Sequence, residues 1–196
     1  MTTKVSDATL DQIFRSAHTA HGFRPDPVPD ASLNALYDLL KWGPTSFNCQ
    51  PARFVFVRSA AAKERLKPAL IPGNVGQTMA APVTVIVAYD TQFFEYLPAQ
   101  YPASDAKPIF VNNAAAARET AFRNATLQGA YLIVAARALG LDCGPMSGFT
   151  PAMVDAEFFA DGRYKSNVLV NIGVADPAKF YPRGPRLAFE TVAQIL

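Results

Sequence analysis

Residues 82–89 constrain the fold of this 196-residue chain more than any other segment. Their sequence is Pro-Val-Thr-Val-Ile-Val-Ala-Tyr, a continuous run dominated by β-branched residues. Such a run is typical of a central strand that is covered on both faces. Residues 53–58 and 166–174 predict further strands. Helical spacing and capping residues predict helices at residues 10–17, 30–40 and 59–70, and a short one from Pro151.

Residues 113–139 form the longest helical pattern, and Gly140 ends it. The second half of this pattern is apolar nearly all round, which predicts a central helix buried on all sides. Residues 142–149 have the composition of a loop of small residues. Helices and strands alternate irregularly, which favours a single α+β domain over a doubly wound fold. No G-x-G-x-x-G follows a strand and no P-loop is present, so a Rossmann-type dinucleotide site is excluded.

The composition excludes several classes of function. The net charge of +2 and the lack of a Lys/Arg run argue against nucleic-acid binding. The most apolar stretch, residues 127–141, is too short to cross a membrane. The start of the chain is polar and lacks the apolar core of a signal peptide, so we expect a cytoplasmic protein with reduced thiols. Cys49 and Cys143 are expected to be small buried residues rather than nucleophiles.

Residues 42–51 form a connection rich in turn-forming and hydrogen-bonding side chains, Trp-Gly-Pro-Thr-Ser-Phe-Asn-Cys-Gln-Pro. Its neutral polar side chains suit either a site for a polar, uncharged ring or a well-capped loop, and the spacing leaves both open. These side chains are Thr45, Ser46, Asn48 and Gln50. Residues 91–112 are aromatic and broken by proline, and they suit either a lid or a packed surface excursion.

His18 and His21 are the only histidines and stand three positions apart. With Arg15, Thr19 and Arg24 nearby they favour contact with an anion, and a pair of surface histidines is the alternative. A metal site is disfavoured, because no Cys or carboxylate partner lies close in the sequence. No G-x-S-x-G motif or other set of acid, base and nucleophile is present, which indicates that a cofactor carries the chemistry.

Several motifs, in their order along the chain, resemble FMN-dependent nitroreductases. Residues 23–29 (Phe-Arg-Pro-Asp-Pro-Val-Pro) and 42–51 resemble the N-terminal signature of that family. Residues 138–149 resemble its second flavin loop, and residues 183–187 its C-terminal basic element. The branch with the closest resemblance is the malonic semialdehyde reductases of pyrimidine breakdown. The points of resemblance to this branch are residues 41–46, 65–70, 119–124, 144–149 and 165–167.

The resemblance implies a domain-exchanged α+β homodimer with a central, mainly antiparallel sheet flanked by helices. It implies one domain over residues 1–196, in which residues 91–112 form a lid or part of the pocket and residues 183–196 wrap around the partner. It further implies two FMN sites at the dimer interface and a ping-pong cycle. In that cycle NADPH or NADH reduces the flavin at N5, and the flavin then reduces a small-molecule substrate.

Matching positions imply where the flavin is held. The loop equivalent to residues 44–48 contacts the flavin across the interface, residues 74–77 hold the pyrimidine edge of the ring, and the backbone of residues 146–148 faces N5. The phosphate is held by residues 18–21 and by a C-terminal arginine. The cofactor-binding residues implied in this way are His18, Thr19, His21, Pro44, Thr45, Ser46, Asn48, Asn74, Gln77, Met146, Ser147, Gly148, Arg183 and Arg186.

One segment departs from the family pattern. Relatives have an Arg-x-Ser-x-Arg-like phosphate grip where this chain has His18-Thr-Ala-His21. A neutral imidazole cannot give the charge-assisted hydrogen bond that a guanidinium gives. We therefore predict that the affinity for FMN falls as the pH rises through the range in which imidazole loses its charge.

Three functions fit these motifs. The first is reduction of malonic semialdehyde to 3-hydroxypropionate, with Arg123 a candidate for holding the substrate carboxylate and Phe110 for the pocket wall. The second is a broad-specificity NAD(P)H reductase of nitro compounds or quinones. The third is a flavin-binding module without turnover. In either enzyme the reacting atom is flavin N5, framed by Ser147 and Gly148, and no metal is implied.

Overall fold

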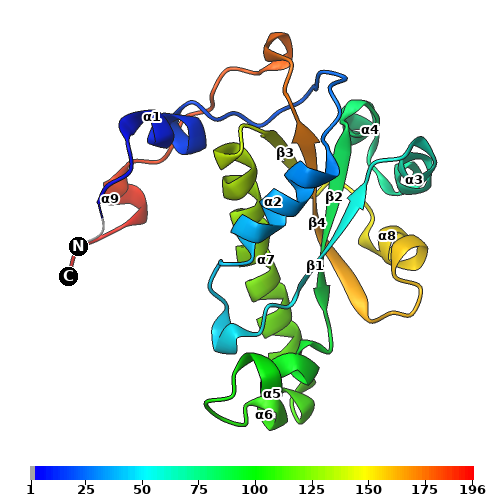
Figure 1. Cartoon of the computed structure of the whole chain (residues 1–196), viewed down its shortest axis with the longest axis vertical. Coiled ribbons are helices and arrows are strands. Elements are labelled where there is room, and N and C mark those ends of the chain that lie inside the picture. The colour runs from blue at the N-terminus through cyan, green and yellow to red at the C-terminus, as the bar shows by residue number, and fades with distance from the viewer. Residues whose placement is uncertain (1–2) are drawn as a thin grey trace.

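The computed structural model describes residues 3–196 (Figure 1). The strands are β1 (Ala52–Val57), β2 (Val83–Asp90), β3 (Asp142–Met146) and β4 (Tyr164–Gly173). The α-helices are α1 (Asp7–Leu10), α2 (Asp30–Leu40), α3 (Ala60–Leu66), α4 (Pro72–Ala80), α5 (Leu97–Gln100), α6 (Lys107–Val111), α7 (Ala114–Ala138), α8 (Pro151–Phe158) and α9 (Phe189–Val192). Shorter turns are the π-helix η1 (Asp11–Arg15) and the 3-10 helices η2 (Ser46–Asn48), η3 (Lys67–Ala69), η4 (Phe93–Tyr96) and η5 (Pro177–Lys179).

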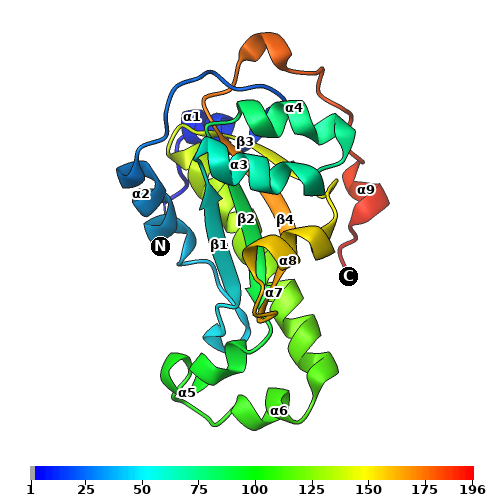
Figure 2. The ribbon, with the colours of Figure 1, turned by 90° about the vertical axis from the view of Figure 1, so that its right-hand side faces the viewer.

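The sheet is antiparallel throughout, in the order β1-β2-β4-β3. Every residue of β2 is buried, which confirms the prediction of a central strand. Successive side chains point to opposite faces, so each inner strand contributes to two cores. On one face α2 and α7 cover Val85 and Val170, and on the other α3 and α8 cover Ile86 and Leu169 (Figure 2). The predicted α+β architecture is therefore confirmed.

The long helix α7 begins at Asn113, whose Oδ1 accepts a hydrogen bond from Ala116 N at 3.0 Å. One face of α7 packs against the sheet, but Phe122, Leu127 and Tyr131 outside that face are 50%, 47% and 41% exposed. The prediction of a helix buried on all sides is therefore wrong for the single chain. Within the described residues, no helix has both the length and the apolar character needed to cross a membrane.

Two elements that position the site are absent from the sequence-based prediction. The composition of residues 142–149 predicts a loop, but residues 142–146 form the edge strand β3. An edge strand pairs on one side only, so it accommodates Pro145. The helix α4 contains Gly73 and Gly76, whose low helix propensity masks the helix in the sequence.

Residues 91–112 pack at one end of the sheet as η4, α5 and α6 (Figure 2). Phe93 and Phe110 are buried there against small residues of α7. The buried carboxylate of Asp90 anchors this end, because it accepts hydrogen bonds from Arg53 at 2.7 Å and from Arg163 at 3.0 Å. The hydrogen bonds that Arg163 itself makes to Asp90 raise the pKa of Arg163. The segment is a packed excursion of the single chain, and its role as a lid stays a prediction.

Candidate functional site

The residues expected to hold the phosphate line one cavity of about 220 Å³. Residues 17–21 form one wall and residues 181–186 form another. The lining residues are Ala17, His18, Thr19, His21, Arg137, Tyr181, Pro182, Arg183, Gly184 and Arg186. None of these side chains is acidic, and most of the polar ones are cations or N–H donors. Such a set of donors matches the charge of a phosphate group.

The edge strand β3 holds the first wall of this phosphate cavity. Ala20 N donates a hydrogen bond to Cys143 O at 2.9 Å, and Thr19 forms a parallel bridge with Cys143. A Cβ atom on Gly144 would lie 2.5 Å from Ala20 O, so the two backbones approach this closely only because residue 144 is glycine. The close approach explains why a small residue follows Cys143.

Aromatic contacts hold the two histidines against the C-terminal segment. His18 stacks on Phe180 with ring centroids 5.0 Å apart, and His21 meets Tyr181 edge to face at 4.6 Å. Both imidazoles therefore lie between the two walls of the phosphate cavity rather than free on the surface. Among residues 3–196, no group of three or more His, Cys, Asp or Glu side chains is arranged to hold a metal ion.

Arg137 lines the phosphate cavity and was missed by sequence reasoning. It lies in the last turn of α7, where a basic residue is ordinary, so its position carries no signal of a site. Its Nη1 donates to Ile13 O at 3.2 Å, and Arg183 donates to Ala17 O at 2.7 Å. A guanidinium has five N–H donors, so both groups keep donors for a ligand. Arg137 therefore adds a guanidinium to the cavity in which the resemblance places the phosphate.

A His18→Leu/His21→Leu variant is expected to bind FMN about threefold to tenfold more weakly than wild type. Both imidazoles line the phosphate cavity, and each has a ring N–H that can donate to a phosphate oxygen. Fluorescence titrations of apoprotein with FMN measure the two dissociation constants. Equal dissociation constants would show that the imidazoles do not contact the phosphate. The dependence of the affinity on pH stays a prediction.

The residues expected to hold the flavin ring form a second group, at the end of β3. Asn74 Nδ2 donates to Gly148 O at 2.9 Å, and Gln77 Nε2 donates to Asn74 Oδ1 at 2.8 Å. A Cβ atom on Gly148 would overlap the side chain of Ile71 and lie 2.7 Å from Asn74 Nδ2. Among the described residues, the N–H groups of Ser147 and Gly148 have no hydrogen-bond partner. These donors suit a flat ring with acceptor atoms along one edge.

The loop of residues 44–48 lies apart from these two groups. It leads into β1, whereas Gly148 follows β3, and these strands form opposite edges of the sheet. Thr45 Oγ1 accepts from Gln50 N at 3.1 Å, and Ser46 N donates to Asn124 Oδ1 at 2.8 Å. Part of the polar set is therefore used within the chain, as the well-capped-loop alternative predicts. Pro44, Ser46 and Asn48 are exposed. The side chain of Asn48 is also used within the chain, since its Nδ2 donates to Gln100 O at 3.0 Å and its Oδ1 accepts from Gln50 Nε2 at 2.9 Å.

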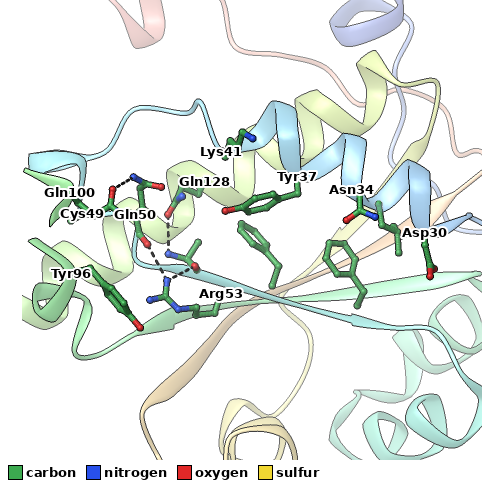
Figure 3. A pocket seen from close by; sticks show the side chains of 14 residues that line it. Asp30, Asn34, Tyr37, Lys41, Cys49, Gln50, Arg53, Tyr96, Gln100 and Gln128 are labelled. Atoms are coloured by element: carbon green, nitrogen blue, oxygen red, sulfur yellow. Dashed lines mark hydrogen bonds between the residues drawn. The ribbon is translucent and has the colours of Figure 1, made fainter.

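A further cavity, of about 710 Å³, lies between α2 and β1 (Figure 3). It is lined by polar side chains that include Asn34, Tyr37, Gln50 and Gln100. Gln50 Nε2 donates to Gln100 Oε1 at 2.9 Å at one end of this cavity. None of the residues expected to bind FMN lines it, so within one chain this cavity and the expected site are different places.

The two candidate substrate residues lie in different surroundings. Arg123 is exposed on α7 and forms an ion pair with Glu119 at the surface. Phe110 is buried and packs on Phe93 with ring centroids 5.0 Å apart. It lines a mainly apolar cavity of about 470 Å³, with Lys165 among the other lining residues. A cavity therefore supports the predicted role of Phe110 in a pocket wall. Arg123 lines none of the four cavities described for residues 3–196.

Both cysteines are expected to resist modification in the folded protein. Cys49 and Cys143 are free and buried, as the sequence predicts. Burial raises the pKa of Cys49 to about 11 and that of Cys143 to about 12, so thiolate is scarce at neutral pH. A colorimetric thiol reagent at pH 8 should detect fewer than one thiol per native chain within minutes, and two after denaturation. Rapid labelling of the native protein would contradict this prediction.

Solved structures identify the class to which this arrangement belongs. One match is a provisionally named nitroreductase from Bacillus subtilis, with a TM-score of 0.86 and 22% identity, over 97% of this chain and 100% of that one. Another is a provisionally named nitroreductase from Exiguobacterium sibiricum, solved in complex with FMN, with a TM-score of 0.85 and 20% identity over 100% of both chains. The fold is the nitroreductase fold.

Sequence comparison gives the family. The nitroreductase family profile matches residues 14–174. A Burkholderia lata protein with the provisional name NADH dehydrogenase/NAD(P)H nitroreductase is 58% identical over 193 residues, which cover 98% of this chain and 99% of the relative. This chain belongs to the nitroreductase family.

Proposed function

We propose that this protein is an NAD(P)H oxidoreductase that uses FMN. One observation carries the proposal: β3 joins the cationic phosphate cavity to the donors that suit a flat ring. Cys143 holds one wall of the cavity, and Gly148 lies five positions further along the same segment. At about 3.3 Å per residue the two points are roughly 16 Å apart, which is comparable to the length of FMN. The FMN-bound neighbour and the name of the Burkholderia relative support the same class.

In this proposal the chain binds and orients the cofactor. When bound, FMN would supply the redox chemistry, which is hydride transfer from NADH or NADPH to a second substrate. The free N–H groups of Ser147 and Gly148 would donate to the ring, and Asn74 and Gln77 would hold its polar edge. The purified protein should therefore be yellow and lose its visible absorption when mixed anaerobically with NADH or NADPH. A flavin-loaded protein that neither nucleotide reduces would support a flavin-binding module without turnover.

The proposal includes a cytoplasmic homodimer in which residues 44–48 reach the partner's FMN. The opposite positions of this loop and Gly148 support it, because one chain does not bring them together. The exposed apolar side chains of Phe122, Leu127 and Tyr131 on α7 suit contact with a partner. Two free cysteines suit a reducing compartment.

Removal of residues 187–196 is expected to convert the dimer to a monomer. Leu187, Phe189 and Val192 are 72%, 57% and 63% exposed, so this tail has apolar side chains without a core of their own. Sedimentation of the truncated chain at micromolar concentration should show the monomer mass. A Gln194→Ala variant is the control, and it should remain dimeric. A truncated chain that sediments as the wild type does would refute the wrapping role of the tail.

For the second substrate we propose malonic semialdehyde, reduced to 3-hydroxypropionate. The motifs at residues 41–46 and 144–149 support this choice. Nitro compounds and quinones are the alternative, which is favoured by the name of the Burkholderia relative and by the ion pair that occupies Arg123. Single-turnover reoxidation of the reduced protein distinguishes them. Faster reoxidation by malonic semialdehyde than by a nitroaromatic compound supports the first, and the reverse order supports the second.

A further inference from the structure

Lys63 is a buried lysine that forms no ion pair within the described residues. It belongs to α3, and only 3% of its surface is exposed. Its Nζ donates to Thr78 O at 2.7 Å, to Ala81 O at 3.0 Å and to Thr84 Oγ1 at 2.6 Å. An ammonium group has three N–H donors, and all three are used. Burying a charge that only neutral acceptors hold costs free energy. We therefore expect the position of Lys63 to have a functional reason.

Hydrogen bonds continue from Lys63 through the core to β3. Thr84 Oγ1 donates to Asn171 Oδ1 at 2.6 Å, and Asn171 Nδ2 donates to Thr78 Oγ1 at 3.4 Å. Thr78 Oγ1 then donates to Met146 Sδ at 3.5 Å. Thr78, Thr84 and Asn171 are fully buried. The chain of bonds therefore links α3, β2, β4 and α4 to the last residue of β3 without water.

The two ends of this network are the two supports of the proposed ring site. The carbonyl groups bound by Lys63 belong to the last turn of α4, and the same helix carries Asn74 and Gln77. Met146 is followed directly by the free N–H groups of Ser147 and Gly148. The hydrogen bond from Asn74 Nδ2 to Gly148 O joins α4 directly to the residues that follow β3.

We propose that Lys63 is a positioning residue for the flavin ring, which fixes α4 and the end of β3 relative to each other from within the core. The inference rests on the proposed function, in which α4 and the end of β3 hold a flavin ring. Lys63 does not touch the ligand, and it acts through Thr78, Thr84 and Asn171. Loss of its three bonds should loosen the amides and N–H groups that face the ring, and leave the phosphate cavity unchanged.

The proposed role of Lys63 has a pH signature. Burial lowers the pKa of Lys63 from 10.5 to about 8. A neutral amine has two N–H donors, so one of the three acceptors loses its bond above this pH. α4 has no titratable side chain. The titratable groups of the other elements lie at strand ends or on the surface: Glu64 and Arg65 on α3, Tyr89 and Asp90 on β2, Asp142 and Cys143 on β3, Asp155 and Glu157 on α8, and Tyr164 and Lys165 on β4.

Stability and flavin affinity should change in opposite directions as Lys63 loses its proton. The unfolded chain keeps this proton up to the higher pKa, so it binds more protons than the folded chain between about pH 8 and pH 10.5. The stability of wild type relative to Lys63→Met should therefore rise with pH in that window. The affinity for a flavin ring should fall there. A residue with a purely structural role would not separate the two quantities.

Titration of apoprotein with riboflavin tests the inference, because riboflavin lacks the phosphate and reports the ring site alone. Lys63→Met is expected to bind riboflavin about tenfold more weakly than wild type at pH 7. Between pH 7 and pH 9 the wild type should lose several-fold in affinity, and the variant should lose none. Lys67→Met removes an exposed lysine near the same helix, and it should follow the wild type.

Three results would overturn the inference. The first is a folded Lys63→Met protein with unchanged riboflavin affinity, even if it melts earlier. If that variant does not fold, a flat wild-type profile between pH 7 and pH 9 is the second, and full affinity in Thr78→Val is the third. A wild-type protein that binds neither FMN nor riboflavin would contradict the proposed function and this inference together.

Discussion

Gly144→Ala is expected to be the most damaging single substitution, lowering the free energy of unfolding by about 3 kcal/mol. The new Cβ atom would lie 2.5 Å from Ala20 O, a backbone atom that cannot rotate away. Either β3 or residues 17–21 must move. At this chain length the loss corresponds to a fall of roughly 6–12 °C in melting temperature. The same movement opens the phosphate cavity, so FMN should bind more weakly as well.

Gly76→Ala is the matched control for Gly144→Ala. No atom lies within 4 Å of the Cβ position at Gly76, and the residue is in the helix α4. Alanine favours the helix over glycine, so this variant should be more stable than wild type by about 0.5–1 kcal/mol. Differential scanning calorimetry of both variants checks the pair. Equal melting temperatures would contradict the close approach of the two backbones.

An Arg137→Met/Arg183→Met variant is expected to bind FMN about 100-fold more weakly and riboflavin about as tightly as wild type. Each guanidinium contributes a charge-assisted hydrogen bond to the phosphate, worth roughly 1.5 kcal/mol. Riboflavin has no phosphate and makes only the contacts of the ring site. The difference between the two ligands therefore locates the loss at the phosphate end.

Isothermal titration of the double variant with each ligand measures this difference. Arg58→Met is the control for the loss of positive charge, because Arg58 pairs with Asp30 far from the phosphate cavity. Its affinity for both ligands should match that of wild type. A double variant that loses FMN and riboflavin equally would show that the arginines support the fold rather than the phosphate.

The parts of the fold that the sequence predicts are those with strong local patterns. Residues 82–89 are dominated by β-branched side chains, and most of them belong to the fully buried β2. Residues 113–139 have helical spacing with a cap and a terminating glycine, and they form α7. Local patterns did not predict β3 and α4, because Pro145 and the glycines of α4 oppose their own elements and tertiary packing overrides them.

The motifs predict which residues form the candidate site but not how they are arranged in space, and their contact with FMN stays a prediction. Motif matching brought residues 18–21 and Arg183 together, and the structure places them in one cavity. Arg137 and Lys63 lie in ordinary helical patterns, and only the packing of distant segments gives them a role. The loop of residues 44–48 shows the converse, since its polar residues stand out in the sequence but lie at the opposite sheet edge from Gly148.

The structure of the protein crystallised with FMN is the most direct test of the proposed site. We expect density for the phosphate within hydrogen-bond distance of Arg137 and Arg183. We expect the ring against the N–H groups of Ser147 and Gly148, with residues 44–48 of a second copy on its far side. Density for FMN in the cavity between α2 and β1, or a phosphate remote from residues 17–21, would contradict the proposed site.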